Sequence, residues 1–192
     1  MRQINTARGI RKKYSPPLLI ALLVIFTVVL SAVSPLSLPI GEVPITLSVL
    51  VLVIIGVVLG PWWGLAPVAA YLLLGLAGVP VYSGFAEGPG ILFGSTGGYL
   101  FSFLFIVLLT GLFVYKFRNP AAQFVGVILG QLAYYAGGVA WAVLLWKSIL
   151  VFALLSGVLS FLVSNLIQSG VGFIIGLVLL RLLPSAKKGV RL

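Results

Sequence analysis

The chain has 192 residues, of which 61% are hydrophobic and only 7% are charged. A water-soluble domain of this size carries about 25% charged residues, so this composition excludes an ordinary soluble protein and indicates one embedded in a lipid bilayer. Histidine and cysteine are both lacking, and Glu42 and Glu87 are the only acidic residues. Because general acid–base, thiol and metal chemistry depend on such groups, we expect no enzyme activity, no metal and no cofactor.

Six apolar stretches follow one another along the chain, and each is long enough to be a candidate helix. They lie at residues 16–33, 45–59, 65–76, 99–115, 121–136 and within 148–183. The second is short and ends at the break Gly60-Pro61. Since a membrane-spanning helix needs about 20 mostly apolar residues, the sequence predicts an all-α integral membrane protein of about six helices. We expect one transmembrane domain at residues 16–183, between a basic segment at 1–15 and a basic tail at 184–192.

The basic residues indicate how this bundle is oriented. With the N-terminus inside, 11 of the 12 basic residues fall on the inner side, and only Lys147 falls outside. Cytoplasmic loops of membrane proteins carry the excess of Lys and Arg, so we expect both termini in the cytoplasm. The basic residues form no stripe with aromatic residues, which argues against a nucleic-acid partner. The outer connections are then residues 34–44, 77–98 and 137–147.

These outer connections are rich in glycine and proline and hold most of the candidate binding residues. Residues 39–47 form either a stiff start to the second helix or one wall of a pocket, with Glu42 and Thr46 in it. Residues 75–90 combine turns with apolar side chains, and irregular backbone at membrane depth survives where it lines a cavity. We therefore expect a binding role for this segment, including Tyr82, Ser83, Gly84, Phe85 and Glu87, with a packed structural loop as the alternative.

Two further glycine pairs open the possibility of close approach by a ligand. The run from Gly94 to Tyr99 begins the fourth helix, where Ser95 or Thr96 is a candidate N-cap and free N–H groups favour an anion or a carbonyl. Gly137-Gly138 predicts a turn, with Trp141 beside it as either an interfacial anchor or a pocket residue.

The last apolar stretch contains two amides, Asn165 and Gln168, which share a helix face because they are three residues apart. Primary amides in an apolar helix are costly unless they form hydrogen bonds. They form either a helix–helix contact or a recognition site for a polar ligand group.

Three motifs together resemble the BioY family, the biotin-binding S components of energy-coupling factor transporters. They are residues 43–47 (VPITL), residues 71–81 (YLLLGLAGVPV) and residues 94–100 (GSTGGYL), with Gly60-Pro61 and Gly64 between the first two. The resemblance implies a six-helix S-component bundle in the bacterial plasma membrane, a vitamin pocket closed by outer loops, and a complex with a membrane coupling subunit and two ATPases.

The chain also departs from the family pattern. Ser48 stands where the family has Gln, and Ser95 where it has Pro. The family's Pro-Gly-Asp-x-x-Lys motif, whose Asp and Lys help to bind biotin, corresponds here to Ser164, Asn165 and Gln168. Both ionic groups are thus replaced by amides.

The expected function is ATP-driven uptake of biotin or a biotin-like vitamin. An S component for another small carboxylate such as lipoate, or a stand-alone solute carrier, are the alternatives. The candidate substrate-binding residues are Thr46, Tyr82, Ser83, Gly84, Phe85, Glu87, Gly97, Gly98, Tyr135, Trp141, Asn165 and Gln168.

Overall fold

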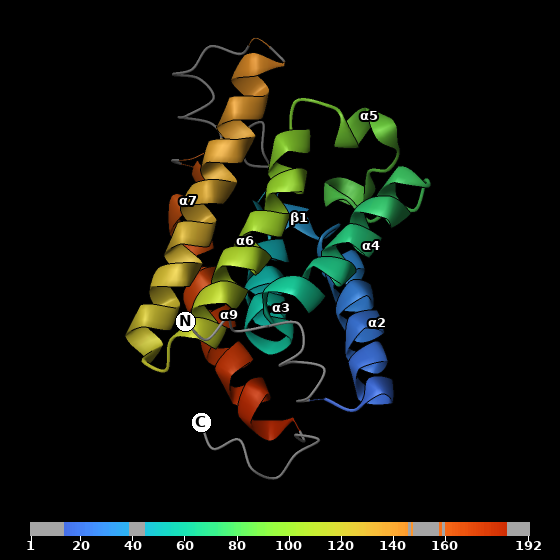
Figure 1. Cartoon of the computed structure of the whole chain (residues 1–192). Coiled ribbons are helices and arrows are strands. Elements are labelled where there is room, and N and C mark those ends of the chain that lie inside the picture. Colours follow the sequence, from blue (N-terminus) through green and yellow to red (C-terminus); the bar gives the residue numbers. More distant parts are fainter. Residues whose placement is uncertain (1–13, 39–44, 146, 148–157, 159, 184–192) are drawn as a thin grey trace.

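The computed structural model of the chain describes residues 14–38, 45–145, 147, 158 and 160–183 (Figure 1). Over these residues the fold is a helical bundle with one very short pair of strands. Its elements are α2 (Pro16–Val33), β1 (Ser37–Leu38), β2 (Ile45–Thr46), α3 (Ser48–Trp63), α4 (Leu65–Leu76), the 3₁₀ turn η1 (Ser83–Phe85), α5 (Pro89–Leu92), α6 (Gly97–Lys116), α7 (Pro120–Leu144) and α9 (Ser160–Leu182).

Four helices in the described part are long and apolar enough to cross a membrane: α2, α6, α7 and residues Leu162–Leu182 of α9. The shorter helices α3 and α4 meet at an angle of 105° and pass the same test as one bent pair, which raises the number to five. The predicted all-α fold is therefore confirmed over these residues, with apolar helices of membrane-spanning length. The predicted stretches 16–33 and 65–76 coincide with α2 and α4, and stretch 45–59 corresponds to α3.

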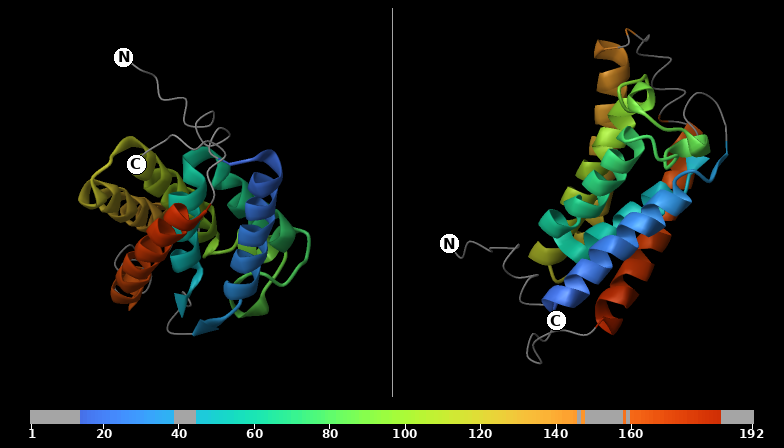
Figure 2. Two further views of the ribbon diagram at one scale, coloured as in Figure 1. Left: turned by 90° about the horizontal axis from the view of Figure 1, so that it is seen from below. Right: turned by 90° about the vertical axis from the view of Figure 1, so that its right-hand side faces the viewer.

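Helix α3 forms the centre of the bundle. Its residues from Val51 to Pro61 are all buried, although nearly all are apolar and would suit a lipid-facing surface equally well. It lies between α9 and α2 when the bundle is seen from below (Figure 2), and it also packs closely on α6. Small residues permit this crossing, since an added Cβ at Gly56 would come within 2.9 Å of Thr110, and at Gly111 within 2.5 Å of the Gly60 backbone.

A sharp kink lies near the end of α3, shortly before α4 begins. Gly60 has φ of 73°, which glycine tolerates readily, and Pro61 lacks the N–H that a continuous helix would use. In the turn before the kink, the carbonyl of Val58 accepts hydrogen bonds from the hydroxyls of Tyr14 (3.2 Å) and Tyr115 (3.0 Å). Side-chain hydroxyls thus donate hydrogen bonds to a backbone carbonyl at the point where the hydrogen bonding of the helix is interrupted.

Three hydroxyl groups join α2, α3 and α4 near the short strands. The Ser34 hydroxyl lies 2.7 Å from that of Ser48 and 2.8 Å from that of Tyr71, and all three residues are buried. The neighbouring strands β1 and β2 pair antiparallel, with Ser37 opposite Thr46. Ser48, which departs from the family pattern, therefore contributes to a contact between helices.

The prediction for the end of α7 was wrong. The fifth stretch was expected to end at residue 136, with a turn at Gly137-Gly138, but the helix continues to Leu144. These glycines instead allow α6 to approach, because an added Cβ at Gly138 would overlap the Tyr99 ring and one at Gly137 would overlap the Ser102 hydroxyl. Most of the expected outer connection 137–147 is therefore helix.

The described charged residues separate toward the two ends of the bundle. Helix α2 begins, α6 ends and α9 ends at the lower end in Figure 1, where Lys116, Arg118 and Arg181 lie. The loop after α4, which contains Glu87, lies at the upper end, and α7 also ends there. We name these two sides of the bundle the lower end and the upper end.

Candidate functional site

Tyr82 fixes the loop after α4 to the bundle. Its hydroxyl donates a 2.7 Å hydrogen bond to the Leu72 carbonyl, and only 1% of the residue is exposed. Its ring lies directly over Gly75, where any Cβ would overlap it, and meets the Tyr71 ring edge-on at 5.7 Å. Burial raises the pKa of the Tyr82 hydroxyl, which therefore remains a neutral donor.

Residues 83–87 form a largely exposed part of this loop. Gly84 and Phe85 both have positive φ (69° and 61°), and the Phe85 side chain is 64% exposed, as is unusual for so large an apolar group. The Gly84 N–H donates to the Pro35 carbonyl (3.1 Å), so the loop contacts the end of α2. Glu87 is exposed, and Ser83 is half-buried.

The start of α6 is held by α7. The indole N–H of Trp141 donates a 2.9 Å hydrogen bond to the Gly94 carbonyl, and its side chain covers Gly98 so closely that a Cβ there would overlap it. Thr96 occupies the N-cap position, but its side chain makes no capping hydrogen bond. The Gly94 carbonyl, and not the expected hydroxyl cap, is the group through which this turn contacts its neighbour.

A continuous row of aromatic rings, which we name the aromatic row, leads from this loop across the bundle. Successive ring centroids along it are 5.2 to 6.3 Å apart, within the range of favourable aromatic contacts. Its members, in spatial order, are Tyr82, Tyr71, Phe103, Tyr134 and Tyr135, with Tyr99 beside Tyr134. Through three intervening rings, the row connects Tyr82 on the loop with Tyr135 on α7, two of the predicted site residues.

The aromatic row ends at a buried polar cluster between α7 and α9. The Asn165 amide donates to the Tyr135 hydroxyl (2.9 Å), and the Gln131 amide donates to the Ser169 hydroxyl (2.7 Å). The Gln168 amide donates to the Ser164 hydroxyl within α9 (3.0 Å). We call these six residues the amide cluster.

Two acceptors of the amide cluster have no partner among the described residues. They are the side-chain oxygens of Gln131 and Gln168, whose residues are only 3% and 5% exposed. An unpaired buried oxygen costs about 1–3 kcal/mol, so its retention calls for a partner. Asn165 thus makes a contact between α7 and α9, one of the two alternatives stated for it, while the side-chain oxygens of Gln131 and Gln168 remain able to accept hydrogen bonds.

Four residues of the aromatic row and the amide cluster were not predicted as site residues: Gln131, Tyr71, Phe103 and Tyr134. Gln131 lies four residues before Tyr135 on the same face of α7. Like Asn165 and Gln168, it is a primary amide in an apolar helix and is costly there unless it forms hydrogen bonds. The three aromatic residues stand in apolar stretches, where nothing in the sequence distinguishes a ring in the row from any other buried ring.

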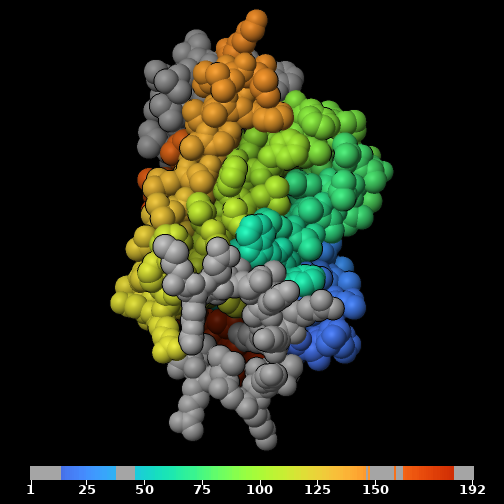
Figure 3. Space-filling model, in the orientation of Figure 1, coloured from blue at the N-terminus to red at the C-terminus, as the bar shows by residue number. Residues whose placement is uncertain are grey.

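The remaining predicted residues lie apart from the amide cluster. The Thr46 hydroxyl accepts a 3.4 Å hydrogen bond from the Ser48 N–H, which places it at the start of α3. Gly97 packs on the Leu92 carbonyl. Glu42, with the rest of residues 39–44, lies outside the described residues. In the space-filling view, α4 and its loop form the right-hand surface and α7 the left-hand surface, on either side of α6 (Figure 3).

The pattern of the BioY family matches residues 5–185, which is nearly the entire chain. The chain belongs to the BioY family. Among its BioY relatives, the biotin transporter BioY2 of Lactococcus lactis subsp. cremoris is 33% identical over 171 residues, covering 88% of this chain and 93% of the relative. A probable biotin transporter BioY of Pyrococcus horikoshii is 32% identical, covering 81% of this chain and 92% of its own.

A solved structure agrees with this BioY assignment. The S-component for biotin from an ECF-type ABC transporter superposes with a TM-score of 0.80 at 26% identity, covering 88% of this chain and 93% of that chain. The expected family and S-component fold are thereby confirmed. The named relatives are transporters, which also supports the expected transport role over an enzymatic one.

Proposed function

We propose that this chain is the S component of an energy-coupling factor transporter and that it binds biotin or a biotin-like vitamin. The observation that carries the proposal is the similarity to the S-component for biotin over 88% of the chain. Family membership over residues 5–185 supports it independently. As an S component, the chain would work with a membrane coupling subunit and two ATPases in the bacterial plasma membrane.

The proposed vitamin site lies between the loop after α4 and the amide cluster. Tyr82 and the aromatic row supply apolar ring surface, and the free oxygens of Gln131 and Gln168 accept hydrogen bonds. Such acceptors suit the N–H groups of a ureido ring, and the flat rings suit an apolar ring system or acyl chain. We retain the twelve residues predicted from the sequence as candidates and add Gln131 to them.

The outward orientation of this site is part of the proposal. Lys116, Arg118 and Arg181 lie at the lower end, which the positive-inside rule assigns to the cytoplasm. The loop with Tyr82 and Glu87 then faces outside, and both basic terminal segments, 1–15 and 184–192, lie inside. Counting α3 and α4 as separate crossings gives six spans for the domain at residues 16–183, in agreement with this arrangement.

A second candidate ligand, lipoate, is favoured by one observation. The amide cluster is uncharged, whereas the family motif carries an Asp and a Lys at the corresponding positions. A neutral site discriminates less strongly for a ureido group, and a ligand with the same acyl carboxylate and an apolar ring would then compete.

Direct binding to the purified protein tests the proposal. Isothermal titration with biotin and lipoate, together with mass spectrometry of co-purified small molecules, should identify one of them as a ligand. Cells that contain the coupling ATPases should then take up the vitamin, and cells that lack them should not. Uptake that persists without them would support a stand-alone carrier, and binding of neither compound would contradict the vitamin assignment.

A further inference from the structure

The buried face of α2 ends in a polar residue. The buried apolar residues of this helix are spaced three or four apart along one face: Leu19, Leu22, Phe26 and Leu30. Ser34 follows Leu30 by four residues and is only 1% exposed, so its hydroxyl continues this face into the bundle. A buried hydroxyl is costly unless it forms hydrogen bonds, and Ser34 therefore needs partners on the neighbouring helices.

The Ser34 hydroxyl has two such partners. It lies 2.8 Å from the Tyr71 hydroxyl on α4 and 2.7 Å from the Ser48 hydroxyl at the start of α3, and both residues are fully buried. We name Ser34, Ser48 and Tyr71 the hydroxyl triad. Because a hydroxyl has one proton to donate, Ser34 accepts a hydrogen bond from at least one of its partners. Loss of the Ser34 hydroxyl would therefore deprive two buried hydroxyls of the bond that they make here.

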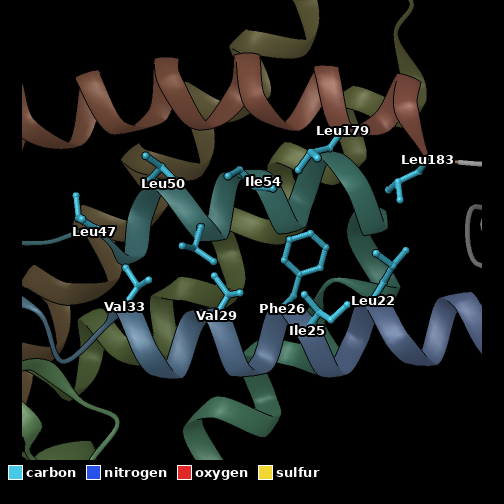
Figure 4. Close-up of a pocket in the computed structure, with 11 residues that line it drawn as sticks. Leu22, Ile25, Phe26, Val29, Val33, Leu47, Leu50, Ile54, Leu179 and Leu183 are labelled. Carbon is cyan, nitrogen blue, oxygen red and sulfur yellow. The ribbon is translucent and has the colours of Figure 1, made fainter.

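The hydroxyl triad holds α2 where that helix is packed on one side only. An apolar groove separates α2 from α9, and Val33 and Leu47 line one end of it (Figure 4). These two residues directly precede Ser34 and Ser48 in the chain, so the triad lies at that end of the groove. Val29, which also lines the groove, is 38% exposed. Beside a groove, where side-chain packing is incomplete, the bonds of the triad carry more of the contact between α2 and the bundle.

The hydroxyl triad also connects with the loop after α4 by two routes. The Tyr71 ring meets the Tyr82 ring edge-on at 5.7 Å, so it forms part of the surface on which the loop rests. Pro35, the residue after Ser34, accepts a 3.1 Å hydrogen bond from the Gly84 N–H. Ser34 thus bonds a ring of the aromatic row and lies next to the residue that bonds the loop.

We propose that Ser34 is a positioning residue of the vitamin site, an inference that rests on the proposed function. Its bond to the Tyr71 hydroxyl fixes the tilt of the Tyr71 ring, and that ring in turn supports Tyr82 and the loop over the site. Its bond to Ser48 joins α2 to α3, which the pairing of β1 with β2 also joins, so this second bond serves stability alone. Ser34 thereby controls how firmly the vitamin is held without contacting it.

Two variants separate the bonds of Ser34. Tyr71→Phe removes the bond to α4 and keeps the ring, whereas Ser48→Ala removes the bond to α3 and is the matched control. Without ligand, Tyr71→Phe should speed hydrogen exchange of residues 82–86 by about twofold to tenfold, the effect of one hydrogen bond, and Ser48→Ala should leave it unchanged. Titration calorimetry with biotin and lipoate should show the affinity for the bound vitamin falling by about the same factor in Tyr71→Phe alone.

A third variant tests Ser34 itself. Ser34→Ala should weaken binding at least as much as Tyr71→Phe, because it leaves the Tyr71 hydroxyl buried without this partner. Adding Tyr71→Phe to Ser34→Ala removes that hydroxyl and should restore part of the affinity. Equal loss of affinity in Tyr71→Phe and Ser48→Ala would overturn the positioning role, as would wild-type affinity or unchanged loop exchange in Tyr71→Phe. A wild-type protein that binds neither vitamin would contradict the proposed function, and the exchange measured without ligand would still decide whether Ser34 holds the loop.

Discussion

The indole N–H of Trp141 and the carbonyl of Gly94 lie 2.9 Å apart, so a side chain of α7 holds the turn that begins α6. This turn closes the segment from Ala77 to Gly98, which also contains Tyr82. Trp141 is therefore positioned to hold the proposed covering loop of the vitamin site against the bundle.

Trp141→Phe should loosen this loop while keeping an aromatic ring over Gly98. Loss of one hydrogen bond costs about 0.5–1.5 kcal/mol, so we expect hydrogen exchange of residues 94–98 to rise by roughly twofold to tenfold. Saturating ligand should slow exchange over residues 77–98 in the wild-type protein and do so less completely in the variant. Unchanged exchange of the loop on ligand binding would argue against its role as a cover.

Gly75 should tolerate no side chain, because the Tyr82 ring occupies the position of its Cβ. Gly75→Ala should displace Tyr82 and lower the free energy of unfolding by about 1–3 kcal/mol, the usual cost of overpacking. Gly90→Ala is the matched control, since an added Cβ there meets nothing within 4 Å. Thermal unfolding in detergent compares the two, and equal stability would show that Tyr82 moves aside without cost.

The amide cluster should control ligand choice. Gln168→Ala and Gln131→Ala each remove a free acceptor, and we expect the affinity for the native ligand to fall by about tenfold to a hundredfold. Titration calorimetry measures this change. Gln123→Ala is the control, because that amide bonds the Phe117 carbonyl at the lower end and should affect stability alone.

The family's ion pair can be restored in the same cluster. Asn165→Asp combined with Gln168→Lys should shift preference toward biotin over lipoate, and either substitution alone should bind less well than the pair because one buried charge remains uncompensated. Competition between the two vitamins measures this preference. If alanine at 165 and 168 lowers only the melting temperature, both residues serve helix packing.

Topology is tested by single cysteines in this naturally cysteine-free chain. Cysteine in place of Glu87 should react with an impermeant thiol reagent in intact cells, because the loop after α4 is expected outside. Cysteine in place of Arg118 or Lys188 should react only after the cells are permeabilised. The opposite pattern would place the proposed vitamin site on the cytoplasmic face.

The helices that could be predicted from the sequence are those with clear start and stop signals. Proline at Pro16 and the break at Gly60 to Gly64 identify the bounds of α2 and α4. The end of α7 could not be predicted in this way, because Gly137 and Gly138 have the composition of a turn. In a membrane helix, glycines also serve close packing, and only the position of Tyr99 on α6 decides between the two.

In the candidate site, too, some residues could be predicted from a local sequence signal and others depend on how the helices pack. Asn165 was identified because an amide among apolar residues is conspicuous, but its partner Tyr135 depends on how α7 and α9 pack. The link from Tyr71 through Phe103 to Tyr134 joins three helices, and no local pattern carries that information. Polar residues in apolar stretches identify a site, whereas its walls are defined by tertiary packing.

The hydroxyls of Tyr14 and Tyr115 meet at the Val58 carbonyl, beside the 105° angle between α3 and α4. These bonds hold the last turn of α3 before the kink to α6 and to Tyr14, just before α2, so this turn would stay in place while the outer loop moves. The outer cover would then open at its own glycines, Gly78, Gly84 and Gly88, which have positive φ and no atoms crowding their Cβ positions.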